Sequence, residues 1–146
     1  MSEAESLQAA YCAETDRAYR RSHGQFFTPR WIARGMAHWV TEPRPRRIVD
    51  PAFGMGILSD ECLRQGFDGL VVGYEIDPAV TQRWRAANAD STAIELRHAD
   101  FLDSADEPIE AAIVNPPYNR FQRRDLSPAL QLTLARSIGA VASGYT

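Results

Sequence analysis

Hydrophobic residues in this 146-residue chain alternate between a strand-like period and a helix-like period. The apolar runs are short, and short polar links separate them from segments that carry apolar residues at helical spacing. This alternation predicts parallel strands joined by right-handed crossover helices, since a parallel neighbour requires a long connection. We therefore expect an α/β fold with a doubly wound sheet and helices on both faces. Strands are expected at 46–51, 69–75, 93–98 and 109–115, and helices at 2–22, 29–41, 56–66, 78–90 and 128–142.

Helix starts and helix faces add further expectations. Three helices are expected to begin with a capping oxygen followed by proline at the first helical position. These starts are Thr28-Pro29, Asp77-Pro78 and Ser127-Pro128. In the first helix the positions expected to be buried are Ala9, Ala10, Ala13 and Tyr19. An amphipathic second helix is expected from the helical spacing of Trp31, Ile32, Gly35, Met36, Trp39 and Val40.

A glycine turn, Asp50-Pro51-Ala52-Phe53-Gly54-Met55-Gly56, follows the first expected strand. Two glycines at a strand-to-helix turn let the backbone approach a ligand closely and adopt conformations that other residues resist. Their spacing differs from the three-glycine fingerprint of pyrophosphate-binding turns. The turn is therefore a candidate ligand loop, and an ordinary strand-to-helix turn is the alternative.

Acidic residues end the next two expected strands. Glu75 lies about 20 residues beyond the glycines, where a carboxylate can accept both hydroxyls of a ribose. Ile76 would then lie against an adenine face, whereas Asp77 is better explained as the cap of the following helix. At the third strand end, Asp100 can bind an adenine amine while Phe101 packs on the plane of the base.

The fourth expected strand runs into Asn115-Pro116-Pro117-Tyr118. The residue before a proline is held extended, so the side-chain carbonyl of Asn115 is presented as an acceptor. The backbone carbonyl of Pro116 adds a second acceptor, and Tyr118 supplies a ring face. Two converging acceptors below an aromatic ring suit the exocyclic amine of a nucleobase. An ordinary strand-to-loop turn is the alternative.

Together these segments resemble the motifs of amino-group DNA methyltransferases. Asn115 to Tyr118 resembles motif IV, and the Asp50 to Gly56 turn is similar to motif I of S-adenosylmethionine methyltransferases. The segment Gly24-Gln25-Phe26-Phe27-Thr28-Pro29 resembles motif X, which closes over the methionine end of the cofactor. The resemblance implies that Thr28 contacts the cofactor carboxylate, since a helix start favours negative charge, and that Phe26 or Phe27 walls the pocket.

The order of the motifs resembles the gamma class, which acts on the 6-amino group of adenine. The resemblance implies site-specific methylation of a flipped adenine in double-stranded DNA by S-adenosylmethionine, in a restriction-modification system. It also implies a specificity or nuclease subunit or domain as a partner. The alternatives are a methyltransferase for protein glutamine or ribosomal RNA, and a cofactor-binding fragment without catalysis.

A complete sheet of this class has seven strands, and this sequence carries four. We therefore expect the N-terminal part of a larger enzyme, inactive alone, without its C-terminal half and its target-recognition domain. Residues 1–45 are expected to form a helical segment with motif X, and 46–146 the cofactor-binding part through the NPPY motif. The run Arg120-Phe121-Gln122-Arg123-Arg124, an aromatic residue among three cations, could contact phosphates, and a solvated loop is its alternative.

Composition sets wider limits. The net charge is −3 and the isoelectric point is near 5.6, unusual for a chain that binds nucleic acid by itself. The DNA is therefore expected to be held mainly elsewhere in the enzyme. We expect a cytoplasmic protein, because the sequence has neither a membrane-length apolar run nor a signal-like start. No metal is expected, since Cys12, Cys62, His23, His38 and His98 lack ligand spacing.

Overall fold

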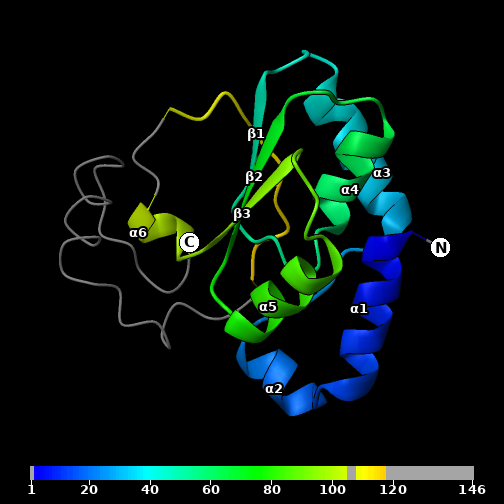
Figure 1. Ribbon diagram of the computed structural model, residues 1–146, viewed down its shortest axis with the longest axis vertical. Helices are drawn as coiled ribbons and strands as arrows, with labels where there is room; N and C mark the ends of the chain where they lie inside the picture. Colours follow the sequence, from blue (N-terminus) through cyan, green and yellow to red (C-terminus); the bar gives the residue numbers. More distant parts are fainter. Residues whose placement is uncertain (1, 105–107, 118–146) are drawn as a thin grey trace, which may run out of the picture.

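A four-stranded parallel sheet forms the centre of the computed structural model, which describes residues 2–104 and 108–117 (Figure 1). The strands lie in the order β3-β2-β1-β4, and each neighbouring pair is parallel. Their bounds are β1 (Arg47–Asp50), β2 (Leu70–Glu75), β3 (Ile94–His98) and β4 (Ala111–Ala112). The helices are α1 (Glu3–Glu14), α2 (Arg17–Ser22), α3 (Arg30–Thr41), α4 (Ile57–Arg64), α5 (Pro78–Ala87) and α6 (Phe101–Ser104).

The strand order confirms the expected doubly wound α/β fold. The chain moves outward from β1 to β2 and β3, and then returns to add β4 on the other side of β1. A topological switch point therefore lies between β1 and β4, at the carboxyl ends of these strands. In open α/β sheets, ligands bind in the crevice at the carboxyl ends of the strands that flank such a point.

Two layers of apolar side chains cover the sheet. On one face Ile48 and Val71, both fully buried, pack with residues of α1, α3 and α4. On the other face Val49, Val72 and Tyr74 pack with the start of α6. Figure 1 shows α1, α3 and α4 together on one side of the sheet and α6 on the opposite side.

The N-terminal helical segment differs from the sequence prediction. The expected helix over 2–22 is two helices, because the extended backbone of Thr15 ends the first and Asp16 caps the second by accepting the N–H of Ala18. The predicted burial of four of its residues was wrong, since Tyr19 is 39% exposed and Ala9, Ala10 and Ala13 are exposed too. Ala4, Leu7 and Tyr11 make the buried stripe instead, with spacings of three and four residues that place them on one face.

Helix α3 is amphipathic as predicted, but its two tryptophans do not face the core. Trp31 and Trp39 are each 77% exposed, whereas Ala33 and Ala37 are fully buried. The small alanine side chains face α4 and allow the two helices to pack closely. Of the other large residues of the predicted stripe, Met36 and Val40 are partly buried and Ile32 is 36% exposed.

The predicted proline starts had different outcomes. Asp77 caps α5 by accepting the N–H of Ala79, and Pro78 occupies the first helical position, as predicted. At α3 the prediction was wrong, because Pro29 itself is the N-cap and makes no side-chain cap bond. The third start at Ser127 and the helix expected at 128–142 lie outside the described residues.

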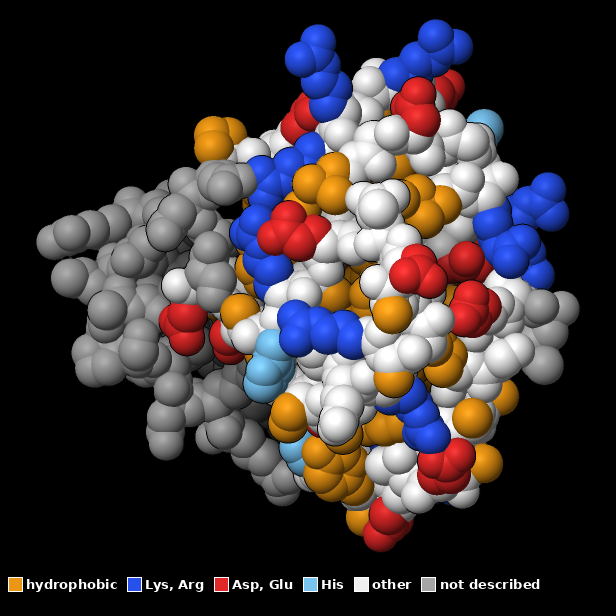
Figure 2. All heavy atoms as spheres, in the orientation of Figure 1, with side chains coloured by type: hydrophobic (Ala, Val, Ile, Leu, Met, Phe, Trp, Pro, Cys, Tyr) orange, Lys and Arg blue, Asp and Glu red, His pale blue; other side chains and the backbone are white. Residues whose placement is uncertain are grey.

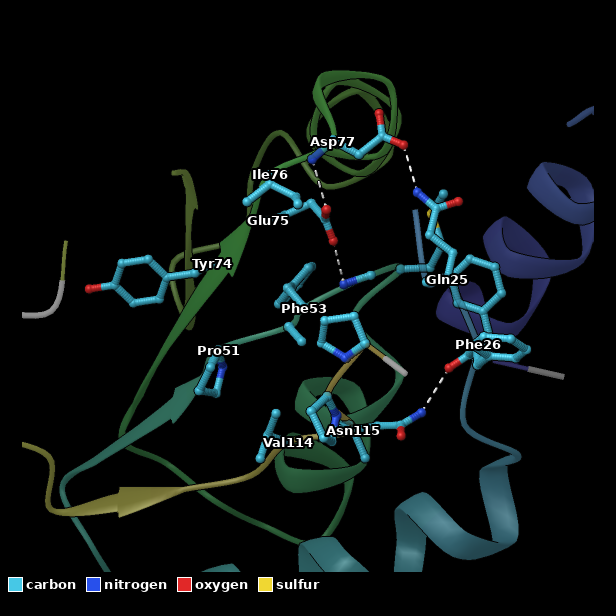
Figure 3. A pocket seen from close by; sticks show the side chains of 18 of the residues that line it. Gln25, Phe26, Pro51, Phe53, Tyr74, Glu75, Ile76, Asp77, Val114 and Asn115 are labelled. Atoms are coloured by element: carbon cyan, nitrogen blue, oxygen red, sulfur yellow. Dashed lines mark hydrogen bonds between the residues drawn. The ribbon is translucent and has the colours of Figure 1, made fainter. Parts of the chain in front are cut away.

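The last described strand is shorter than predicted. Pairing with β1 is limited to Ala111 and Ala112, and the N–H of Ile113 donates to the carbonyl of Val49 at 2.9 Å. Beyond Ile113 the chain leaves the ladder and runs along the end of β1 towards the switch point (Figure 3). This early departure places residues 114–117 beside the glycine turn.

Charged side chains are interspersed on the visible face of the described part. Figure 2 shows arginine and acidic side chains alternating over this face rather than gathering by sign. This part of the surface is therefore not a single-sign patch of the kind that binds phosphates. Within residues 2–104 and 108–117, no helix has both the length and the hydropathy needed to cross a membrane.

Candidate active site

A cavity of about 580 Å³ lies at the carboxyl ends of the strands, at the switch point (Figure 3). This volume is within the range of pockets for small organic ligands. Each motif segment that falls within the described residues contributes to its lining, from the loop before α3 to the residues after β4. The cavity therefore brings together groups that lie as many as 109 residues apart in the chain, the separation of Gln8 and Pro117.

The glycine turn forms the floor of the cavity, with Pro51, Ala52, Phe53 and Gly54 in its lining. Gly54 has a φ of 57°, a conformation that L residues with side chains rarely adopt. A Cβ atom there would lie 3.4 Å from the ring of Phe27, close to ordinary contact, so the backbone conformation rather than the available space favours glycine here.

Gly56 and Asp50, also predicted to contact a cofactor, do not line the cavity. Gly56 has a φ of 78° and begins α4, and a Cβ atom there would lie 2.7 Å from the ring of Phe53. Asp50 is fully buried below the turn, where its Oδ2 accepts the hydroxyl of Ser59 at 2.9 Å. Burial raises the pKa of Asp50 to about 7, against the hydrogen bond from Ser59. Its Oδ1 has no hydrogen-bond partner among the described residues.

The carboxylate of Glu75 connects two turns at the tip of β2. Its Oε2 accepts the N–H of Gly54 at 2.9 Å, and its Oε1 accepts the N–H of Asp77 at 2.8 Å. Burial raises the pKa of Glu75, and the two backbone N–H groups oppose that rise. Each carboxylate oxygen retains a lone pair, so the group can accept further hydrogen bonds from a ligand in the cavity. The neighbouring Ile76 lines the cavity and is 44% exposed.

Asp77 is the centre of a buried hydrogen-bond group that the sequence prediction missed. Its Oδ2 accepts Gln25 Nε2 at 2.6 Å, the hydroxyl of Tyr11 at 3.2 Å and that of Tyr19 at 3.3 Å. Burial alone would raise the pKa of Asp77, but these bonds and the N–H of Ala79 outweigh it, so the pKa is lowered. The three partners lie 52 to 66 residues before Asp77 in the chain, and no local spacing indicates these contacts.

The third strand end also reaches the cavity, through Asp100 and Phe101. Asp100 Oδ1 accepts the N–H of Leu102 at 3.0 Å, which turns the chain into α6. Phe101 packs edge-on against Tyr74, with ring centroids 5.3 Å apart. The side chains of this tip are therefore held by local contacts at one end of the cavity.

The residues after β4 line the side of the cavity opposite Glu75 (Figure 3). Asn115 Nδ2 donates to the backbone carbonyl of Phe26 at 2.8 Å, while Pro116 and Pro117 lie in the lining beside it. Because the carbonyl can only accept, the amide nitrogen must face Phe26 and the amide oxygen is left for another partner. Tyr118, the fourth residue of the predicted catalytic set, lies outside the described residues.

The loop before α3 completes the wall. Phe26 is 53% exposed and lines the cavity together with Phe27 and the buried Thr28. Phe27 is fixed by an edge-on contact with Tyr11, whose ring centroid is 5.9 Å away. The structure therefore places Thr28 in the lining of the cavity, although this residue is not the cap of α3.

Comparison with known proteins gives one family. The model of the family described as N-6 DNA Methylase matches residues 11–129. Three similar curated proteins are Type II methyltransferase M.AccI from Acinetobacter calcoaceticus, M.HincII from Haemophilus influenzae and M.CvrRI from Paramecium bursaria Chlorella virus XZ-6E.

These relatives are similar over most of this chain but are much longer. M.AccI is 26% identical over 122 residues, which are 82% of this chain and 23% of that protein. M.HincII is 31% identical over 108 residues, which are 73% and 19% of the two chains. M.CvrRI is 30% identical over 100 residues, or 68% and 25%. The chain thus spans about a fifth to a quarter of the length of the relatives that it matches.

Proposed function

The chain belongs to the N-6 DNA methylase family, and on this basis we propose that it supplies the cofactor pocket and the catalytic tip of an adenine-specific DNA methyltransferase. The observation that supports this proposal is the convergence of Gly54, Glu75 and Asn115 on one cavity. A glycine turn, an acidic strand tip and an amide acceptor meet at the switch point, where α/β sheets bind their ligands.

We propose S-adenosylmethionine as the cofactor, and the residues of the cavity fit its parts. Glu75 would accept the ribose hydroxyls, with Ile76 and Phe101 against the adenine and Asp100 on its amine. Thr28 and Phe26, near the start of α3, would meet the methionine end. The positive φ of Gly54, in the floor of the cavity, is a further feature that suits a ligand lying close to the backbone of the turn. When bound, this cofactor supplies an electrophilic methyl group.

Asn115 and Pro116 would hold the target amine by accepting its two hydrogens. The lone pair of that amine is delocalised into the adenine ring, which makes it a poor nucleophile. Two acceptors, the Asn115 side-chain oxygen and the Pro116 carbonyl, favour a more tetrahedral nitrogen with its lone pair directed away from them. No general base with a shifted pKa is required, so positioning supplies most of the rate.

A flipped base would be needed, because duplex DNA hides the amine. Extrusion costs a few kcal/mol, and stacking on an aromatic ring, worth about 1–3 kcal/mol, would offset much of it. We propose Tyr118 as that ring and Pro117 as the residue that stiffens its approach.

We propose further that residues 1–45 act as a helical segment that closes the cofactor pocket and 46–146 as the cofactor-binding part. Double-stranded DNA would be bound by the full-length protein, in a restriction-modification system with a specificity or nuclease subunit or domain. Because DNA is the proposed substrate, the cytoplasm is the proposed location. The length of the relatives, of which this chain spans a quarter or less, supports a DNA surface formed largely by other residues.

A methylation assay of the full-length protein tests the proposal. Unmethylated DNA should take up labelled methyl groups from S-adenosylmethionine, and digestion to nucleosides should give N6-methyladenine. Release factor and ribosomal RNA serve as competing substrates, since the alternatives act on an amide or on a guanine amine. Methylation of either in place of DNA would contradict the proposed substrate. Absence of cofactor binding in a calorimetric titration would contradict the proposed pocket.

A further inference from the structure

Two consecutive residues, Gln25 and Phe26, contact opposite sides of the cavity. The side chain of Gln25 donates to Asp77 at the β2 side, at 2.6 Å. The backbone carbonyl of Phe26 accepts from Asn115 at the β4 side, at 2.8 Å. Figure 3 shows both bonds, with the loop before α3 between them. One peptide segment therefore links the cofactor side of the site to the amide that would hold the target.

The Gln25 end of this segment is strongly anchored. Its acceptor, Asp77, is only 2% exposed, and hydrogen bonds to a buried charged group are stronger than those between neutral groups. Gln25 Oε1 also accepts the hydroxyl of Tyr11 at 3.0 Å, so the donor and the acceptor of the amide are both used. The backbone N–H of Gln25 donates to the carbonyl of Arg20 at 2.8 Å. These bonds hold the segment in place, and with it the backbone carbonyl of Phe26, the next residue.

The orientation of Asn115 depends on that carbonyl. A side-chain amide can rotate by half a turn, which exchanges its donor and its acceptor at nearly the same positions. The carbonyl of Phe26 favours the orientation in which Nδ2 faces Phe26 and Oδ1 is left for another partner. In the opposite orientation the amide would present its N–H groups to the target amine, which also carries hydrogens.

We propose that Gln25 is a positioning residue that, through the carbonyl of Phe26, orients the Asn115 amide for acceptance of the target amine. The effect of this orientation on methyl transfer rests on the proposed function, whereas the link from Gln25 to Asn115 rests on the hydrogen bonds themselves. Gln25 acts at a distance, because its own amide is occupied by Asp77 and Tyr11. Loss of its bonds should leave the fold and the cofactor contacts of Glu75 in place but release the loop that holds Asn115.

A first experiment measures the coupling without any substrate. The full-length protein, labelled with ¹⁵N at asparagine, is compared with Gln25→Met and Gln25→Glu, which keep the length of the side chain and remove its donor. The Asn115 side-chain signal is assigned by its loss in Asn115→Ala. We expect slowed hydrogen exchange of this amide in the wild type and exchange about 10-fold faster in both variants. Unchanged exchange in either folded variant would overturn the proposal.

A second experiment measures the consequence for the target base. With S-adenosylhomocysteine present, the protein is titrated with two DNA duplexes that contain the sequence it methylates. One duplex has adenine at the target position, and the other has purine, which lacks the 6-amino group. The wild type should prefer adenine because two acceptors meet its amine, and both Gln25 variants should lose that preference. The rate of a single turnover should fall by about 10–100-fold while the affinity for S-adenosylhomocysteine changes less than about threefold. A retained preference for adenine would overturn the proposal.

A matched control separates this role from a general loss of stability. Gln65 also donates from its side-chain amide to another helix, at 2.7 Å to the carbonyl of Arg34, far from the cavity. Gln65→Met should leave the Asn115 exchange rate and the base preference unchanged. If the wild type itself methylates no DNA, the proposed function fails, while the exchange experiment still decides whether Gln25 orients Asn115.

Discussion

Glu75 Oε2 accepts the backbone N–H of Gly54 at 2.9 Å, so the tip of β2 holds the glycine turn that follows β1. The other oxygen of the same carboxylate accepts the N–H of Asp77 at the start of α5. One side chain therefore fixes the shape of two turns that line the cavity. Its remaining lone pairs point to a second task in ligand binding.

We expect Glu75→Ala to weaken the binding of S-adenosylmethionine by about 1–3 kcal/mol, because the change removes acceptors for two hydroxyls and frees two buried N–H groups. Calorimetric titration measures the affinity. Glu95→Ala on the neighbouring strand is the control, since Glu95 is exposed and pairs with Arg97 at 2.7 Å. Equal affinities for the Glu75 variant and the wild type would show that the ribose lies elsewhere.

Asn115→Ala should reduce methyl transfer by about 10²–10³-fold, the usual effect of removing one preorganised hydrogen-bond partner of a reacting group. Cofactor affinity should stay nearly unchanged, because Asn115 lies across the cavity from Glu75. A single-turnover assay and a calorimetric titration separate the two effects. The matched control is Asn88→Ala, which removes an amide that donates to the carbonyl of Trp84 at 3.0 Å in α5. Similar losses in both variants would argue against a role in transfer.

Two glycines give opposite expectations for stability. A Cβ atom on Gly73 in β2 would lie 2.2 Å from the ring of Phe53, which is buried and cannot move aside. Gly73→Ala should therefore lower the free energy of unfolding by about 1–3 kcal/mol. Gly35 in α3 has no atom within 4 Å of such a Cβ, so Gly35→Ala should raise it by about 0.5–1 kcal/mol. Denaturant unfolding of both variants measures the difference, and a stabilising Gly73→Ala would refute the packing around Phe53.

Stability should depend on pH through Asp50. Burial raises its pKa to about 7 in the folded chain, against 3.8 for an ordinary aspartate. Between about pH 4 and pH 7 the folded state therefore keeps a proton that the unfolded state has lost, and stability falls as the pH rises through this window. Asp50→Asn should remove this dependence. The free energy of unfolding of the variant, relative to that of the wild type, should therefore be higher at pH 8 than at pH 4. Denaturant unfolding at several pH values tests it, and parallel curves for the two proteins would contradict it.

The clustering of the site was predictable because parallel strands end at the same edge of a sheet. Residues at four strand ends, among them Gly54, Glu75 and Asn115, could therefore be expected in one cavity from their places in the chain alone. The contacts of Gln25 and Tyr11 could not, since each reaches Asp77 across more than 50 residues and no periodicity encodes that distance.

Burial on the helices was less predictable than the helices themselves. Periodicity indicated α3 correctly, but it did not indicate which residues of the helix are most deeply buried. The structure buries Ala33 and Ala37, because a close contact with α4 requires small side chains. At α1, Tyr11 is buried despite its hydroxyl, since Gln25 and Asp77 provide partners for it.

The positions of the three tryptophans make intrinsic fluorescence a probe of the cavity. Trp31 and Trp39 face solvent, where a soluble quencher can reach them, whereas Trp84 is 5% exposed. The indole of Trp84 meets the ring of Phe53 edge-on, with centroids 5.2 Å apart, and Phe53 is part of the cavity floor. With the two surface indoles quenched by iodide, the remaining fluorescence comes from a residue one ring away from the ligand. Binding at the switch point could then be followed in real time without a label.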